Sequence, residues 1–304
     1  MNKVVIIGCG NVGMAYAYAL VNQKTFVDEL VLIDINVDKT VGEVMDLNHC
    51  LAYSPSKMHI KVGNYQDCKD AKIVVITAGA NQKPGETRMD LINKNSSIFK
   101  DIIEKIKTSG FSGIYLVATN PLDVMTYLTL KYSGTEYSKV IGTGAALDTA
   151  RLRYLLGEKI DVCSKDIDAF VIGEHGDSEF IPWSNANIGF KKVIDYLTKE
   201  ELEEIENQVR NSAYEVINRK GATCYGIGTC MVRITNAILE DKKVILAVSS
   251  YDKKNDVCIS TPTIVGKNGV SEKIFIPLSS DEERKLQESI DIIKLAIQSL
   301  EENK

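Results

Sequence analysis

The stretch "KVVIIGCGNVGMAYAYAL", residues 3–20, decides the fold. An apolar run reaches Gly8, further glycines follow at Gly10 and Gly13, and a helix-type sequence comes directly after them. In a strand–turn–helix unit, the first glycine allows a tight turn, the second lets backbone approach a pyrophosphate, and the third allows the helix to pack closely on the strand. The stretch predicts a dinucleotide-binding site; a glycine-rich turn in an unrelated α/β fold is the alternative.

The acidic residue that follows this motif indicates which dinucleotide is bound. Asp34 ends the second apolar run, about 20 residues beyond Gly13, as a dinucleotide site requires. A carboxylate there accepts hydrogen bonds from both ribose hydroxyls of the adenosine and repels the 2′-phosphate of NADP. The sequence therefore favours NAD over NADP as the cofactor.

Short strands alternate with helical patterns through the first half of the chain. Runs rich in Val and Ile recur at residues 30–35, 59–63, 72–79, 113–120 and 139–144. Near-continuous apolar runs between helices are typical of a parallel sheet covered on both faces, and right-handed crossovers make such a sheet doubly wound. We predict an α/β fold whose N-terminal domain, residues 1–143, is a doubly wound parallel sheet.

The pattern changes after this point to a mixed α+β domain, predicted for residues 144–304. We expect helices at 147–160 and about 198–220, and strands at 169–172, 243–249 and 257–265. Ser280 and Glu283 predict a capping box at the start of a C-terminal helix. The apolar residues of that helix are spaced alternately four and three apart, which indicates core packing: Leu286, Ile290, Ile293, Ile297 and Leu300.

Composition excludes several classes of protein. The net charge of −5 argues against a surface for nucleic acid or anionic membrane. The seven cysteines are odd in number and show no C-x-x-C spacing, so we expect reduced thiols and no metal site. The apolar run at the start is too short to cross a bilayer, and no signal peptide is apparent. We therefore expect a cytoplasmic protein.

Two further stretches carry candidate catalytic residues. "AFVIGEHGDSE", residues 169–179, places His175 after an apolar run, and a histidine of ordinary pKa near ~6.5 can give or take a proton. In "TAGANQKPGETRMDLINKN", residues 77–95, Pro and Gly predict a mobile loop over 80–87 that ends at Arg88. Each residue also has an interpretation without catalysis: His175 could be a histidine in a charged surface loop, and Arg88 an arginine in the first turn of a helix. The functional interpretation is a proton donor and a cation carried over a substrate by a closing loop.

Six motifs together resemble a known family over essentially the whole chain. In order, they are "GCGNVG", "ANQKPGETR", "ATNPLDV", "LDTARLR", "IGEHGDSE" and "GAT". They are similar to those of the bacterial L-lactate dehydrogenases in the lactate/malate dehydrogenase family. The resemblance implies an NAD-dependent enzyme that reversibly transfers a hydride between NADH and pyruvate.

The resemblance also implies a role for each candidate residue. His175 matches the proton donor and acceptor, and Asp148 matches the carboxylate that holds the other histidine nitrogen. Arg151, three residues after Asp148 on one helical face, matches the clamp for the substrate carboxylate. Arg88 matches the loop arginine that polarises the carbonyl, and Asn120 matches a residue that contacts substrate and nicotinamide.

The remaining matched positions form the substrate pocket and the cofactor site. Thr223 matches a substrate-pocket residue, and Ile227 matches an apolar wall against the nicotinamide. The positions implied to bind cofactor are Gly8, Gly10, Val12, Gly13, Asp34, Thr77, Ala78, Gly79, Asn120 and Ile227.

Gln82 separates pyruvate from dicarboxylic substrates within the family. Malate dehydrogenases of this type have an arginine there, and a second substrate carboxylate buried without a cation costs several kcal/mol. Neutral Gln82 favours pyruvate; a malate dehydrogenase or another L-2-hydroxyacid dehydrogenase is the alternative. An NAD-using glycosidase, which needs a metal-binding Cys/His pair, or a redox-sensing dinucleotide-binding protein, which needs no proton donor, is disfavoured.

The resemblance bears on assembly and regulation as well. Family members are mostly homotetramers, and many bacterial ones are activated by fructose 1,6-bisphosphate through an arginine and a histidine. Arg153 matches the arginine, but Asp168 stands where the histidine would be, and a carboxylate repels phosphate. We expect a homotetramer that responds weakly or not at all to this activator, unless other groups at the site replace the histidine.

Overall fold

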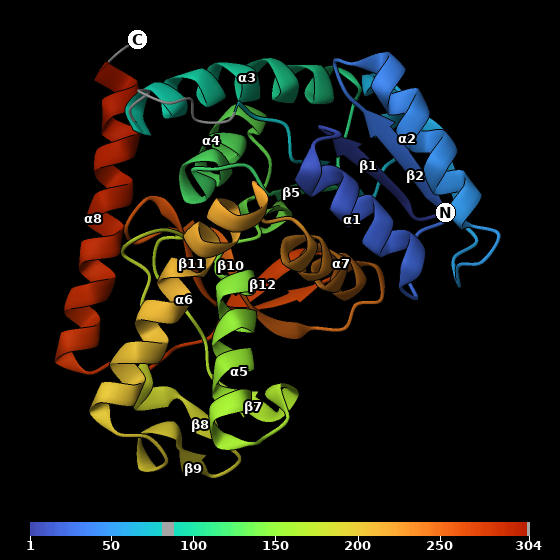
Figure 1. Cartoon of the computed structure of the whole chain (residues 1–304). Coiled ribbons are helices and arrows are strands. Elements are labelled where there is room, and N and C mark those ends of the chain that lie inside the picture. Colours follow the sequence, from blue (N-terminus) through green and yellow to red (C-terminus); the bar gives the residue numbers. More distant parts are fainter. Residues whose placement is uncertain (81–87, 303–304) are drawn as a thin grey trace.

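The computed structural model describes residues 1–80 and 88–302, and within these the side chains of residues 1–80 and 90–300. Its framework is a nine-stranded sheet of order β12-β11-β10-β6-β5-β4-β1-β2-β3. Helices cover both faces of the sheet, and a second, three-stranded sheet lies at the far end of α5 and α6 (Figure 1).

The parallel half of the sheet confirms the predicted doubly wound parallel sheet. The strands of this half are β1 (Lys3–Ile7), β2 (Glu29–Ile33), β3 (His59–Val62), β4 (Ile73–Ile76), β5 (Ile114–Val117) and β6 (Val140–Gly142). All of their pairings are parallel. The chain order reverses at β1, which pairs with β2 on one side and β4 on the other, and ligands of such sheets bind at this point.

Alternate residues of the central strands build two cores, one on each face of the sheet. Val4 and Ile6 of β1 pack in a cluster with residues of α1 (Asn11–Asn22), α2 (Val37–Cys50) and α7 (Tyr225–Leu239). Val5 and Ile7 pack on the opposite face with α3 (Arg88–Thr108), α4 (Leu122–Ser133) and α8 (Ser280–Glu302). This two-sided burial is why the strands read as continuous apolar runs.

The C-terminal half extends the same sheet with antiparallel strands. β10 (Val244–Asp252) pairs with β6 through Ser249 and Gly142, and β11 (Val257–Gly266) and β12 (Gly269–Lys273) follow as hairpins. α5 (Ala146–Ile160) and α6 (Lys199–Lys220) pack beside the small sheet of β7 (Ile167–Asp168), β8 (Asn187–Ile188) and β9 (Lys191–Lys192). Short 3-10 turns occupy Tyr65–Cys68, Tyr137–Lys139, Ser164–Asp166, Trp183–Asn185 and Val193–Asp195.

Two predictions about local structure were wrong. The run at 169–172 forms no regular strand; Ile172 bridges Phe180 and Gly173 bridges Ser260, because Gly173 takes a φ of 100° and turns the chain. The capping box of α8 uses Ser279 and Glu282 in place of Ser280 and Glu283. The Ser279 main-chain N–H donates to Glu282 at 2.8 Å, and the same glutamate accepts from Ser184, which draws it inward.

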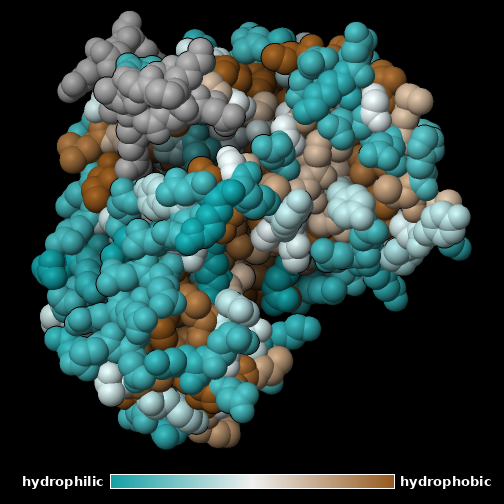
Figure 2. Space-filling model, viewed as in Figure 1, coloured by the Kyte–Doolittle hydropathy of each residue, from teal (hydrophilic) through white to brown (hydrophobic). Residues whose placement is uncertain are grey.

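Polar side chains dominate the surface around α6 and α8 (Figure 2). Within residues 1–80 and 88–302, no helix combines the length and the apolar character needed to cross a membrane. The predicted loop lies outside the described residues, apart from Ala80.

Candidate active site

The glycines after β1 form a cradle that fits a dinucleotide. Gly8 has a φ of +106°, and a Cβ there would lie 2.4 Å from the Ala78 nitrogen, so only glycine fits. A Cβ on Gly13 would lie 2.1 Å from the Gly8 oxygen, which also accepts a 2.6 Å hydrogen bond from the Thr77 hydroxyl. A Cβ on Gly10 would meet no described atom within 4 Å, so its backbone is open to a ligand.

The start of α1 is available to bind phosphate. Gly10 is the N-cap and offers no side-chain acceptor in the described structure, so the first N–H groups of this helix can donate to a pyrophosphate. At the end of β2, Asp34 accepts from the Cys9 nitrogen at 2.6 Å and from the Asn36 nitrogen at 2.9 Å. These bonds fix the carboxylate beside the cradle, and its remaining lone pairs can accept from ribose hydroxyls. The residues present fit NAD.

One cavity of about 550 Å³ joins this cradle to the predicted catalytic residues. Val12, Thr77 and Gly79 line it from the cofactor side. The catalytic side is lined by the predicted residues Asn120, Asp148, Arg151 and His175. The cavity thus brings together motifs that are far apart in the sequence.

His175 is held from two directions. Its Nδ1 lies 2.7 Å from Oδ2 of Asp148 on α5, and its main-chain N–H donates to Oδ2 of Asp123 on α4 at 2.7 Å. The imidazole remains 26% exposed, whereas the Asp148 side chain is 3% exposed. The ring is therefore fixed through Nδ1, and Nε2 is the nitrogen left to exchange a proton with a substrate.

Asp148 links the histidine to the predicted carboxylate clamp. Its second oxygen accepts a 2.7 Å hydrogen bond from Nη1 of Arg151, one helical turn further along α5. Burial alone would raise the pKa of Asp148, but the positive charges of His175 and Arg151 outweigh burial and lower it. Asp148 is therefore a charged carboxylate between two cations.

The same contacts stabilise the charged form of His175. Burial on its own would lower the pKa of this histidine, but the charge and hydrogen bond of Asp148 outweigh burial and raise it to about 9. At neutral pH the imidazolium form therefore dominates, which is the form that can donate a proton.

Sequence reasoning missed Asp123. This residue is 2% exposed in the first turn of α4, and it accepts from the Ser249 hydroxyl at 2.6 Å as well as from the His175 backbone. Burial raises its pKa to about 6, against the lowering effect of these two hydrogen bonds. The available signal was its place three residues after Asn120, where an acidic residue also suits the N-terminus of a helix.

Sequence reasoning also missed Glu179, which lines the same cavity and is 5% exposed. One side-chain atom each of Asp148, His175 and Glu179 lies within 4.8 Å of the others. We call these three residues the acid–base cluster. Such a group has the composition of a cation site, but Arg151 already supplies positive charge to it.

The remaining predicted residues differ in where they lie relative to the cavity. Asn120 is on its wall, and the Asn120 carbonyl accepts a 2.8 Å hydrogen bond from Asn95. Thr223 and Ile227 are half-buried at and near the start of α7 and are not among the described residues of the cavity wall. α6 contributes wall residues that were not predicted: Arg210, Ala213, Tyr214 and Ile217. Gln82 lies outside the described residues, as does the side chain of Arg88.

Comparisons with known proteins agree with this arrangement. Residues 2–142 match the family model of the lactate/malate dehydrogenase NAD binding domain, and residues 145–304 match that of the alpha/beta C-terminal domain. The chain is 48% identical to an L-lactate dehydrogenase of Oceanobacillus iheyensis, over 97% of this chain and 94% of that protein. It is 49% identical to an L-lactate dehydrogenase of a Geobacillus strain, over 97% and 95%.

Solved structures show the same similarity. A lactate dehydrogenase from a Medee basin deep-sea metagenome library superposes with a TM-score of 0.96 at 48% identity, covering 99% of both chains. The minor L-lactate dehydrogenase of Enterococcus mundtii, in its ligand-bound form, superposes with a TM-score of 0.96 at 40% identity, covering 98% of both chains. With both domains matched along its length, and an NAD cradle opening onto a paired histidine and aspartate, the chain belongs to the lactate/malate dehydrogenase family.

Proposed function

We propose that this chain is an NAD-dependent L-lactate dehydrogenase, which reversibly reduces pyruvate to L-lactate. The observation that carries the proposal is the hydrogen-bonded series Arg151–Asp148–His175 on the wall of the cavity. Val12 and Thr77 line the same cavity on the side of the cofactor. A 2-oxo acid needs its carboxylate held, its oxygen protonated and a hydride delivered to carbon. Bound NADH supplies the hydride.

The protein residues supply the other requirements. The planar guanidinium of Arg151 pairs with the substrate carboxylate, and Asp148 fixes that guanidinium from behind. His175 donates the proton from Nε2 to the substrate oxygen during reduction and takes it back during oxidation. We assign Arg88 the stabilisation of negative charge that develops on this oxygen.

We assign the choice of substrate to Gln82, as the sequence predicts. A neutral side chain there suits the methyl group of pyruvate and leaves the second carboxylate of oxaloacetate without a cation. The test is to follow NADH consumption by the purified protein with pyruvate and with oxaloacetate. Faster turnover of pyruvate supports the assignment, and a preference for oxaloacetate overturns it in favour of a malate dehydrogenase.

We also propose that fructose 1,6-bisphosphate activates this enzyme weakly or not at all. Arg153, the candidate phosphate ligand, donates to the Ala169 carbonyl at 2.9 Å and stacks 4.7 Å from the Phe170 ring. Asp168 directly precedes Ala169, the residue that accepts from Arg153. Burial lowers the pKa of Arg153, the negative charge of Asp168 acts in the opposite direction, and the positive charge of Arg233 lowers it. A phosphate would have to compete with these contacts and with the Asp168 charge.

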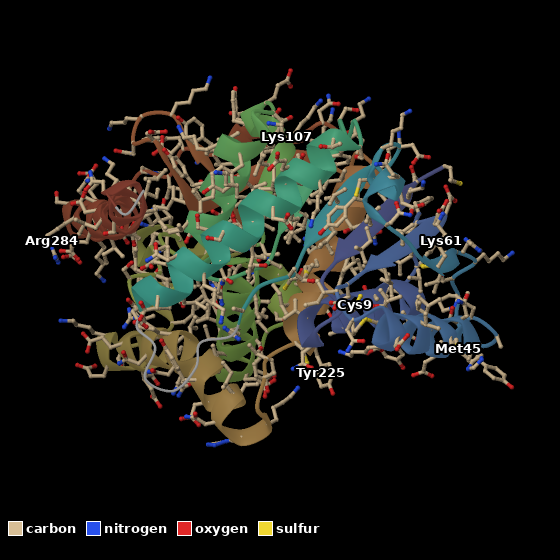
Figure 3. All side chains as sticks on the ribbon, turned by 90° about the horizontal axis from the view of Figure 1, so that it is seen from above. Cys9, Met45, Lys61, Lys107, Tyr225 and Arg284 are labelled. Atoms are coloured by element: carbon tan, nitrogen blue, oxygen red, sulfur yellow. The ribbon has the colours of Figure 1, made fainter. Side chains whose placement is uncertain are left out.

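A homotetramer remains the proposed assembly. The exposed face of α2 carries an apolar stripe at Val37, Val41 and Met45, which are 57%, 43% and 56% exposed, and Met45 projects outward from the ribbon (Figure 3). Exposed apolar stripes of this kind usually mark contacts with another chain. Light scattering coupled to size exclusion measures the assembly directly, and a monomeric mass at micromolar concentration would contradict the proposal.

We propose a cytoplasmic enzyme that regenerates NAD during fermentation, and a boundary between NAD-binding and substrate domains at residues 143/144. Cell fractionation tests the first. The domain boundary is tested by expressing residues 1–143 alone and titrating the fragment with NADH; we expect the fragment to fold and to bind NADH.

A further inference from the structure

Glu179 is a buried carboxyl group for which the proposed reaction has no role. It faces the cavity but is 5% exposed, and it lies in the acid–base cluster with Asp148 and His175. A buried carboxylate without a cationic partner is costly, so such a group either finds a cation or keeps its proton.

The cations around Glu179 are engaged with other carboxylates. From α5, Arg151 pairs with Asp148 at 2.7 Å, and His175 uses Nδ1 for the same aspartate. From α6, Arg210 pairs with Glu206 at 3.1 Å and gives the Glu179 residue only a hydrogen bond to its main-chain carbonyl. Within the described residues, the Glu179 carboxyl therefore has no cation of its own.

The anions on the other sides disfavour a further negative charge. Asp148 on α5 and Asp123 on α4 flank His175, and Asp177 lies on the same loop, where its oxygen accepts from the Tyr214 hydroxyl of α6. The substrate adds its own carboxylate to this cavity. An ionised Glu179 would repel the substrate and hold the proton more tightly on His175, which opposes proton transfer.

We propose that Glu179 is a positioning residue that keeps its proton at neutral pH and donates it in a hydrogen bond to Asp148, so that Asp148 is the charged carboxylate of the acid–base cluster. Burial, together with the charge and the hydrogen bond of Asp148, raises the pKa of Glu179 to about 9 against the lowering effect of His175 and Arg151. This inference rests on the proposed function, and it adds a second group that fixes Asp148 beside Arg151.

The first test compares Glu179→Gln with the wild-type protein, because an amide is a permanently neutral donor of the same shape. At pH 7 we expect the KM for pyruvate to be nearly the same in both. Above about pH 9 we expect the wild-type KM to rise at least about tenfold more than the variant KM, because only the wild type gains a charge. Glu282→Gln is the matched control: it alters a buried glutamate that accepts from Ser184 and Ser279 away from the cavity, so its KM should follow the wild type at every pH.

A second readout does not depend on activity. Infrared difference spectroscopy of the wild-type protein should show the carbonyl band of a neutral carboxylic acid at pH 7, lost above about pH 9 and absent from Glu179→Gln. A KM already about tenfold lower in the variant at pH 7, or a wild-type spectrum without this band, would show that Glu179 is ionised and overturn the proposal. Wild-type protein that does not turn over pyruvate would instead refute the proposed function, and the infrared result would still decide the state of Glu179.

Discussion

Nδ1 of His175 lies 2.7 Å from Oδ2 of Asp148, although the two residues are 27 positions apart in the chain. The histidine follows a turn at Gly173, and the aspartate lies in the first turn of α5. Two unrelated local structures thus meet in one contact, which sets both the orientation of the ring and its charge.

Asp148→Asn should remove that charge while keeping the shape. We expect the pKa of His175 to fall from about 9 toward its ordinary value, because Asp148 is the main group that raises it. Reduction needs the protonated ring, so kcat/KM for pyruvate should fall at least about 100-fold at pH 7 to 8, and its high-pH limb should move to lower pH. Steady-state kinetics across pH measures both; an unmoved limb would contradict the assignment.

The same contact makes stability depend on pH. The pKa of His175 is raised in the folded protein, so its contribution is complete below ~6.5 and is lost as the pH rises through about 9. The pKa of Asp148 is lowered, so its contribution is present at neutral pH and is lost in acid. Because of this histidine, we expect the free energy of unfolding of the wild-type protein to fall by about 1–3 kcal/mol between pH 6.5 and 9. The fall should be smaller in His175→Gln. Urea unfolding at fixed protein concentration measures the difference, and equal slopes would contradict it.

Asp123→Ala should destabilise the protein and slow catalysis. The substitution leaves the His175 N–H and the Ser249 hydroxyl without their acceptor in a buried site, at about 1–3 kcal/mol for each group. The backbone that carries His175 also loses its anchor. Asp123→Asn keeps one acceptor and is the control. The free energy of unfolding and kcat/KM should both be lower in the alanine variant than in the asparagine variant. Equal losses in the two variants would contradict an anchoring role.

Gly13→Ala tests the cofactor cradle. The added Cβ would lie 2.1 Å from the Gly8 oxygen and 2.8 Å from Oγ1 of Thr77, so the glycine turn must shift. We expect the Kd for NADH to rise at least about tenfold. Gly42→Ala, in α2, is the matched control because its Cβ meets no described atom within 4 Å. NADH fluorescence titration measures both, and unchanged affinity in Gly13→Ala would contradict the cradle.

Asp168→His tests the account of regulation. The substitution removes the carboxylate near Arg153 and supplies a group that can donate to phosphate. Millimolar fructose 1,6-bisphosphate should leave the pyruvate half-saturation of the wild type nearly unchanged and lower that of the variant. A wild-type decrease of more than about tenfold would show that other groups bind the activator.

Much of the fold could be predicted because its signals are local. The parallel strands are buried on both faces, so each reads as a continuous apolar run, and the Gly8–Gly13 spacing marks the turn that follows β1. The strand expected at 169–172 was wrong because only Ile172 of this run has a bridge partner, the distant Phe180, and the chain turns at Gly173. The union of β10 with β6 into one sheet is likewise a long-range contact.

The candidate site divides in the same way. His175, Asp148 and Arg151 were predicted because they stand in motifs, and the structure places them in contact. Asp123 and Glu179 are distinguished by their burial and by neighbours that are distant in sequence. In the sequence alone, neither residue differs from an ordinary acidic residue of the surface. The cost of charge in a buried site becomes visible only when the elements have been assembled.

The most direct test of the central claim is the pH dependence of kcat/KM in both directions, with pyruvate and NADH and with L-lactate and NAD. We predict that reduction is lost and oxidation is gained as the pH rises toward about 9, because one group, His175, must be protonated for the first and neutral for the second. The claim would be contradicted if kcat/KM changed in the same direction with pH for reduction and oxidation. It would also be contradicted if His175→Gln kept full activity and the same pH dependence.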